Sequence, residues 1–187
     1  LMQKIHTLKQ GDMLILAGSI PKSMPDTIYM DIMAQLQDKG IDIVVDATGD
    51  LLMKVLPYHP FLVKPNNHEL GELFGVELKT REEVVPYARK LQEQGARNVL
   101  VSMAGEGAVL LDEKGTEHMS EAPKGKVVNA VGAGDSMVAG FVAGYQESGD
   151  YEYAFHMGLS AGSASAFSEN LATAEEVKNL FNTIHKK

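Results

Sequence analysis

Four short apolar runs, each separated from the next by a helix-like segment, constrain the fold of this chain more than any other feature. They are MLILAG (13–18), IDIVVDA (41–47), FLVK (61–64) and NVLVSM (98–103). A strand that is apolar on both faces must be covered on both, and strands that alternate with helices pair in parallel. We therefore expect a parallel sheet with helices on both faces, and we expect the first run to be a buried strand.

The segments between these runs carry helical periodicity and recognisable helix ends. Helices are predicted at 25–39, 67–75 and 80–94. The third opens with Thr80 and has Glu83 three positions later, which is the spacing of a capping box. Gly95 then ends that helix, as glycine commonly does.

The pattern changes after the fourth apolar run. Residues 108–120 are typical of a hairpin whose turn holds Glu113, Lys114 and Gly115. Three further helices are predicted at 133–148, 150–168 and 173–185. Their inner faces are rich in glycine and alanine, and such small residues allow two backbones to approach closely.

The opening residues also have helical spacing. Leu1, Ile5 and Leu8 recur as they would on one face of a helix already in progress. This pattern leads us to expect that the chain is the C-terminal portion of something longer.

Composition and charge exclude several classes of function. Hydrophobic residues make up 44% of the 187 residues and charged residues 22%, which is typical of a globular domain. The net charge of -8 argues against binding to nucleic acid or to an anionic membrane surface. The chain has no cysteine, which excludes disulfides and thiolate metal sites. No apolar run is long enough to span a membrane and no signal-peptide pattern is present, so a cytoplasmic location is the default expectation.

The histidines do not have the spacing of a metal site. We expect His6, His59, His118 and His185 at the surface. His68, which lies inside a polar segment discussed below, is the histidine of most interest.

The stretch VNAVGAGDSMVAGFVAG places Gly132, Ala133 and Gly134 at the start of a predicted helix, with Asp135 directly behind them. It is not a P-loop, which needs Gly-Lys-Ser/Thr, and it is not a dinucleotide fingerprint, which needs glycine where Met137 stands. Amides that converge at a helix start stabilise negative charge, and a neighbouring aspartate can take a proton from a hydroxyl. A plain glycine turn followed by a first-turn acid is the competing interpretation of the residues alone.

Together with other segments, VGAGDSMVAGF resembles the ribokinase-like (PfkB) sugar kinases. The other matching segments are AGSIPKSMP (17–25), VKPNNHELGELFG (63–75), VSMAGEGAVLL (101–111) and SAGSASAFSENLAT (160–173). The resemblance covers essentially the whole chain. It implies a ribokinase-like three-layer α/β/α core with a mainly parallel sheet that lacks its N-terminal part, so that residues 1–187 would be the C-terminal portion of a single kinase domain.

The resemblance implies a catalytic role for the glycine loop. Asp135 would be the base that deprotonates the acceptor hydroxyl. Gly132, Ala133 and Gly134 would supply the amides that surround the transferred phosphoryl group.

A second group of implied site residues follows the third apolar run. Asn66 and Glu69 match the Asn-x-x-Glu element of the family, just past the end of a strand, where ligands collect in open parallel sheets. Glu69 would help to order Mg²⁺, mainly through water, and Lys64 would point its ammonium group at the phosphates of ATP. A solvated helix cap and a surface lysine are the competing interpretations of these residues.

The nucleotide loop of the family matches the end of the fourth run. The residues implied to contact ATP there are Ser102, Met103, Ala104, Gly105, Glu106 and Gly107. A simple strand-to-hairpin turn would use its glycines in the same way. Asn170, with Ala161 and Gly162, would form the wall of the adenine site, although close helix packing explains the two small residues equally well.

The activity implied by the resemblance is ATP-dependent phosphorylation of a sugar phosphate with Mg²⁺. The favoured acceptor is fructose 1-phosphate, which would give fructose 1,6-bisphosphate, and tagatose 6-phosphate is the alternative acceptor. An inactive nucleotide-binding fragment is the alternative from a different class. The residues that bind the sugar are expected before Leu1, and a homodimer is expected for the full-length protein, with no nucleic-acid or membrane partner.

Overall fold

The computed structural model describes residues 2–185 as two compact units. One unit contains residues 2–101 and 111–116, and the other contains residues 102–110 and 117–185. The predicted opening helix is present as α1 (Met2–Ile5), but it ends at Ile5, so Leu8 of the predicted pattern lies beyond it, and Leu1 is outside the described residues. The strands form one sheet in the order β1-β2-β3-β4-β5-β6.

The first unit is built on four strands. They are β1 (Met13–Ala17), β2 (Asp42–Asp46), β3 (Leu62–Val63) and β4 (Asn98–Ser102). Each pairs in parallel with the next, and the register between β2 and β3 sets Val44 against Leu62 and Val45 against Val63. All four predicted strands and their parallel pairing are therefore confirmed.

Strand β1 is less buried than its sequence suggests. Of its five residues only Leu16 is buried, and Ile15 is 42% exposed. Among the described strands β1 pairs only with β2, so it lies at the edge of the sheet. The prediction of a buried strand at 13–18 is therefore wrong in its burial, although the strand itself is present.

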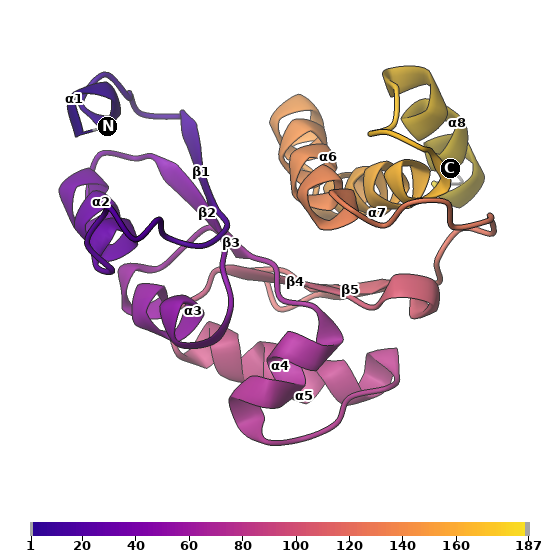
Figure 1. Ribbon diagram of the computed structural model, residues 1–187, viewed down its shortest axis with the longest axis horizontal. Coiled ribbons are helices and arrows are strands. Elements are labelled where there is room, and N and C mark those ends of the chain that lie inside the picture. The colour runs from indigo at the N-terminus through magenta and orange to yellow at the C-terminus, as the bar shows by residue number, and fades with distance from the viewer. Residues whose placement is uncertain (1, 186–187) are drawn as a thin grey trace. The chain divides into compact units, whose positions relative to one another are not determined.

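The helices of the first unit connect its strands. They are α2 (Ile28–Leu36), α3 (Gly49–Val55), α4 (Asn67–Phe74) and α5 (Arg81–Glu93), with a short 3₁₀ helix at Leu56–Tyr58. Within this unit, α2 to α5 follow one another along one side of the strands (Figure 1). Right-handed crossovers between sequential parallel strands place successive helices on one face in this way. Helix α3 is not predicted from the sequence, because its seven residues are too few to show helical periodicity.

The start of α5 is the capping box that its sequence predicts. The Thr80 hydroxyl accepts a hydrogen bond from the Glu83 amide (3.3 Å), and the Glu83 carboxylate accepts one from the Thr80 amide (3.1 Å). Hydrogen bonds from the amides of Lys79 and Thr80 lower the pKa of Glu83, so its carboxylate remains charged beside the helix start.

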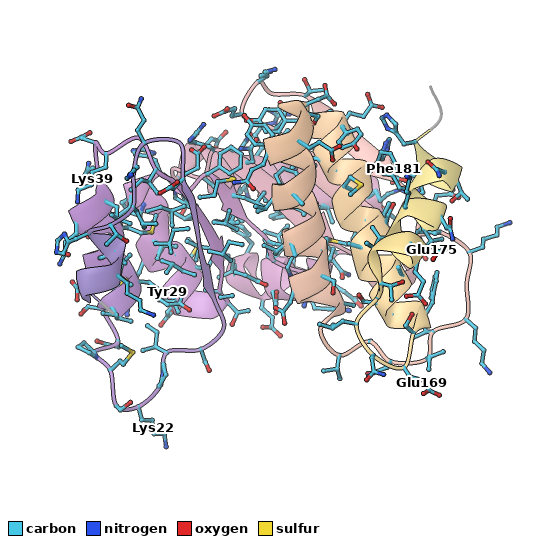
Figure 2. The ribbon with its side chains drawn as sticks, turned by 90° about the horizontal axis from the view of Figure 1, so that it is seen from above. Lys22, Tyr29, Lys39, Glu169, Glu175 and Phe181 are labelled. Carbon is cyan, nitrogen blue, oxygen red and sulfur yellow. The ribbon has the colours of Figure 1, made fainter. Side chains whose placement is uncertain are left out.

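The second unit is mainly helical. Its elements are the 3₁₀ helix Ala104–Glu106, most of β5 (Ala108–Leu111), β6 (Glu117–Ser120), α6 (Ala133–Ser148), α7 (Tyr151–Phe167) and α8 (Ala174–Ile184). The predicted hairpin and all three C-terminal helices are confirmed to within one or two residues. Figure 2 labels Glu175 and Phe181 on α8.

Helices α6 and α7 approach each other closely because glycines occupy their contact face. A Cβ atom at Gly140 would lie 2.6 Å from the Met157 carbonyl oxygen and 2.7 Å from the Ala161 Cβ. A Cβ atom at Gly162 would lie 3.0 Å from the Ala133 carbonyl oxygen. Ala161 and Gly162 thus pack α6 against α7, which is the structural alternative to a role in an adenine site.

Three histidines of the second unit are half-buried. The Nδ1 atoms of His156 and His185 lie 2.9 Å apart, so this hydrogen bond requires a ring nitrogen that is not protonated. His185 also stacks on Phe181 with 4.8 Å between ring centroids, and the His118 ring lies 6.2 Å from that of Phe155. The expectation that His118 and His185 lie at the surface is therefore wrong, because aromatic contacts draw both rings inward.

The surroundings of His156 favour its neutral form. Burial lowers the pKa of His156, and the nearby imidazoles of His185 and His118 lower it further. The carboxylates of Glu152 and Asp150 oppose this change but do not reverse it.

We expect this histidine to make the stability of the protein depend on pH. Between the lowered pKa of folded His156 and the ordinary value of about 6.5, the unfolded chain binds more protons, so the free energy of unfolding should rise with pH. The contribution of His156 to stability should be complete at a pH above its ordinary pKa. That contribution should be lost as the pH falls through the lowered pKa of His156 in the folded protein. Urea unfolding from pH 5 to pH 8 measures this dependence. The free energy of unfolding should rise less steeply with pH for His156→Gln than for the wild type, whereas exposed His6→Gln should keep the wild-type dependence on pH.

The α6–α7 contact can be tested at Gly140. Gly140→Ala should destabilise the protein by about 1–3 kcal/mol through overpacking, although alanine is the better helix former. Ala139→Gly, at the exposed neighbouring position, should cost only the difference in helix propensity, about 1 kcal/mol. Thermal unfolding measures both, and an unchanged or higher midpoint for Gly140→Ala would contradict the close contact.

Candidate functional site

Lys64 directly follows β3 and is buried. It is 7% exposed, and its Nζ lies 3.5 Å from Oδ1 of Asp46, the last residue of β2. The alternative interpretation of Lys64 as a surface lysine is therefore excluded. Asp46 is not among the site residues predicted from the sequence, although an acidic residue at the carboxyl end of an apolar strand is a signal for such a site.

Asn66 and Glu69 form the capping box of α4. The Asn66 side chain accepts a hydrogen bond from the Glu69 amide, and Glu69 Oε2 accepts one from the Asn66 amide, both at 2.8 Å. The cap that sequence analysis named as the competing interpretation is therefore present. It engages Oε2 of Glu69, so Oε1 is the oxygen through which this half-buried carboxylate could act on a ligand. His68, between them, is exposed.

The start of α6 lacks a side-chain cap. Its N-cap residue, Gly132, has no side chain to offer, and no cap hydrogen bond from a side chain occurs there. Ala133 donates its amide hydrogen to the carbonyl three residues earlier (3.2 Å), and Ser136 donates to Gly132 (2.9 Å). Within the described part of the chain, the amides of Gly134 and Asp135 receive no such cap, and Asp135 itself is exposed.

The backbone conformation favours glycine at position 132. Its φ of 78° lies in the left-handed region that side chains disfavour. A Cβ atom there would lie 2.9 Å from Cδ2 of Leu171, but this exposed side chain is free to move away. The residue that exposes the helix amides is thus fixed by the local backbone.

A buried serine links the start of α6 to the end of α7. The Ser165 hydroxyl donates to the Ser136 hydroxyl (2.8 Å) and accepts from the Ala172 amide (3.1 Å). The amides of Val128 and Asn129 donate to a single carbonyl near the end of α7. The loop 132–135 therefore lies against residues 165–172, the segment that contains the exposed Asn170. Ser165 is not among the site residues predicted from the sequence, since one serine in a run of small residues gives no signal.

The predicted nucleotide loop forms a compact turn. The Met103 amide donates to the Gly107 carbonyl (2.9 Å), and the Gly107 amide donates to the Ala104 carbonyl (3.1 Å). A Cβ atom at Gly107 would lie 2.0 Å from the Ser120 carbonyl oxygen, so a tight turn explains this glycine without a ligand. Met103 is 3% exposed and can offer a ligand only its main chain, whereas Ala104, Gly105 and Glu106 are exposed.

A cavity of about 660 Å³ runs along α6, α7 and α8 within the second unit. Ser136, Ser165, Leu171 and Ala172 line it beside the start of α6, and Lys178 of α8 is a charged lining residue. Its volume lies within the range of about 300–1,000 Å³ that is usual for small-molecule pockets.

The described residues also limit the kinds of site that are present. From residue 2 to residue 185, no group of three or more histidine or acidic side chains is arranged to hold a metal ion. None of the helices in that range is long and apolar enough to cross a membrane.

Each unit, taken by itself, offers groups that suit a ligand carrying phosphate. A buried lysine at a strand end supplies positive charge, and the uncapped start of a sixteen-residue helix supplies amide donors beside a carboxylate. Such features, on a parallel sheet with crossover helices, are typical of the α/β proteins that bind phosphorylated ligands.

The chain belongs to the pfkB family of carbohydrate kinases, whose family model matches residues 2–178. It is 48% identical over 179 residues to the 1-phosphofructokinase of Bacillus subtilis, which covers 96% of this chain and 59% of the relative. It is 35% identical to the D-tagatose-1-phosphate kinase of Bacillus licheniformis, over 95% of this chain and 58% of that protein. A Staphylococcus aureus crystal structure, provisionally named a phosphofructokinase, superposes with a TM-score of 0.93 at 39% identity, over 99% of this chain and 60% of that one.

The predicted ribokinase-like α/β fold is confirmed by this match. The chain spans about three fifths of the length of the relatives that it matches.

Proposed function

We propose that the protein transfers the γ-phosphoryl group of ATP to the C6 hydroxyl of fructose 1-phosphate, giving ADP and fructose 1,6-bisphosphate. The observation that carries the proposal is the start of α6, where uncapped amides adjoin an exposed aspartate. The names of the two curated relatives support an acceptor that carries its phosphate on C1. The tagatose kinase among them is named for the 1-phosphate, so tagatose 1-phosphate is a more direct second candidate than tagatose 6-phosphate.

The proposed chemistry is an in-line displacement at phosphorus. The acceptor oxygen forms a bond to the γ-phosphorus, the bond from that phosphorus to the bridging oxygen breaks, and ADP leaves with the electron pair. Asp135 accepts the hydroxyl proton as general base. The amides of Gly134 and Asp135 stabilise the charge on the transferred group, whereas the Ala133 amide already donates to the Ala130 carbonyl and helps to shape the loop.

The remaining predicted residues would bind the nucleotide. Lys64 would contact its phosphates, and the exposed part of the 102–107 loop would contact the nucleotide directly, with Met103 acting through its main chain. Asn170 and the nearby end of the cavity, lined by Leu171 and Ala172, would hold the base. Ala161 and Gly162 pack against α6, so they would form the wall of this region and would not contact the base directly.

Magnesium would be held mainly by water and by the phosphates of the nucleotide. Mg²⁺ retains much of its hydration shell in such sites, which fits a chain whose described residues hold no ready metal cluster. Oε1 of Glu69 would order one of the metal's waters, and the ion when bound would neutralise phosphate charge. No step of the proposed proton transfer depends on it.

Asp135→Asn should lower turnover by about 10²–10⁴-fold, because the carboxamide side chain of asparagine cannot accept the hydroxyl proton. The affinity for ATP should change little, since the amides at the helix start are retained. Steady-state kinetics with fructose 1-phosphate, on protein expressed from its complete reading frame, measure both. Glu147→Gln, on the same helix and also exposed, should keep wild-type turnover, and near-normal turnover of Asp135→Asn would remove this aspartate from the mechanism.

Glu69→Gln removes the charge of this residue but keeps its role in the helix cap, so this variant distinguishes the two roles. Glutamine can also complete a capping box, so the unfolding midpoint should stay close to that of the wild type. The Mg²⁺ concentration for half-maximal rate should rise by about ten-fold or more, as for other residues that orient metal ligands, with less effect on the sugar phosphate KM.

The matched control for this change is Glu83→Gln, which alters the equivalent carboxylate in the capping box of α5. It should leave the magnesium titration unchanged. Equal titrations for Glu69→Gln and the wild type would leave Glu69 with the role of a helix cap alone.

A further inference from the structure

The ion pair between Lys64 and Asp46 is well shielded from solvent. The side chains are 8% and 16% exposed, and Nζ and Oδ1 lie 3.5 Å apart. Lysine is almost never buried to this degree without a partner of opposite charge. Burial of a single charge would be far more costly than burial of the pair, so the presence of Asp46 accounts for a charged lysine at this position.

The sheet fixes the positions of both residues. Val45 of β2 is in register with Val63 of β3, and Asp46 and Lys64 are the next residues on these two strands. Both backbones therefore end side by side at the carboxyl edge of a parallel pair. An ion pair held by two buried strands loses little side-chain freedom when a ligand arrives.

Asp46 is itself held in place on its other side. Its carbonyl accepts a hydrogen bond from the Gly18 amide (3.0 Å) after β1. Tyr29 on α2 (Figure 2) donates its hydroxyl hydrogen to the Ala17 carbonyl (2.8 Å), next to this strand end. Burial raises the pKa of Tyr29, and the Asp46 carboxylate raises it further, so the phenol remains neutral.

We propose that Asp46 is a positioning residue whose ion pair holds the charged Lys64 ammonium group at the carboxyl end of β2 and β3. The phosphates of the nucleotide then meet a cation that is already held in place. The inference rests on the proposed function, in which Lys64 contacts the phosphates, and it adds a second residue that determines how strongly this contact depends on pH.

Removal of the carboxylate should change the behaviour of Lys64 in a specific way. Without Asp46, the buried ammonium group lacks this partner of opposite charge, so burial disfavours its charged form. A bound polyphosphate restores the missing negative charge, so nucleotide binding becomes coupled to proton uptake. Tyr29, whose phenol is neutral and lies near the Asp46 carboxylate, cannot supply that charge.

The test compares four variants of the protein expressed from its complete reading frame. They are Asp46→Asn, Lys64→Met, the double variant, and Asp42→Asn. The last is a matched control, because Asp42 lies at the opposite end of the same strand and is paired with Arg97. The readouts are the KM for ATP and kcat from about pH 6.5 to about pH 9.5, with saturating sugar phosphate.

The wild type should keep a constant KM for ATP across this range. For Asp46→Asn the KM should rise with pH, by up to about ten-fold for each pH unit, because nucleotide binding then requires proton uptake, with a smaller change in kcat. Lys64→Met should raise the KM at every pH, and the double variant should match it, because Asp46 acts through Lys64. Asp42→Asn should follow the wild type in KM, whatever its effect on the unfolding midpoint.

Two kinds of result would overturn the inference, and they are distinguishable. A flat, wild-type KM profile for Asp46→Asn beside a large effect of Lys64→Met would remove Asp46 from the nucleotide contact and leave the proposed function intact. An unchanged KM in Lys64→Met, or no nucleotide-dependent turnover in the wild type, would overturn the proposed phosphate contact and the positioning role with it. Additive effects in the double variant would also contradict the inference.

Discussion

The parallel pairing of β1 to β4 is the constraint on which the first unit depends. Parallel strands all end at one edge, so a polar residue placed after any of them arrives at the same edge as its neighbours. The register between β2 and β3 brings Asp46 and Lys64 together there without any long-range motif in the sequence. The capping box of α4 begins two residues further on and fixes the direction in which the chain leaves the sheet. Charge and backbone direction at this edge thus follow from strand order alone.

The second unit also fixes the positions of its candidate site residues, but it does so by different physical means. Glycines at the contact between α6 and α7 let the two helices approach so closely that Gly162 lies against the Ala133 carbonyl. The position of the α6 start is therefore set by backbone contact rather than by flexible side chains. The Ser165 hydroxyl then connects Ser136 to the segment after α7. This rigidity suits a loop whose amides must keep their direction in the absence of a ligand.

Much of the fold could be predicted because its signals are local. The apolar runs, the Thr80 capping box and the glycine stops of α4 and α5 each depend on a few neighbouring residues, and these elements lie within one or two positions of their predicted bounds. Helix α2 is the exception, because it spans Ile28–Leu36 and is three residues shorter at each end than predicted. The failures have a common cause, which is tertiary context. Burial of the β1 strand depends on what pairs with its outer edge, and the inward position of His185 depends on Phe181 and on a helix one element away. The candidate site follows the same division: Lys64 and Asp135 stand in recognisable segments, whereas Asp46 and Ser165 acquire their importance only from residues distant in the sequence.

The geometry at Gly107 limits how the 102–107 loop can be redesigned. Its φ of 93° and its close approach to the Ser120 carbonyl leave no space for a side chain, so the closing end of the turn must stay as it is. A Cβ atom at Gly105 would meet no neighbouring atom and Glu106 is exposed, whereas Ala104 has a left-handed φ of 46° that larger side chains disfavour. A library built on this loop would therefore diversify Gly105 and Glu106 and leave Ala104, Gly107 and the turn length unchanged. The loop combines a closing residue that the backbone fixes with two positions that tolerate change.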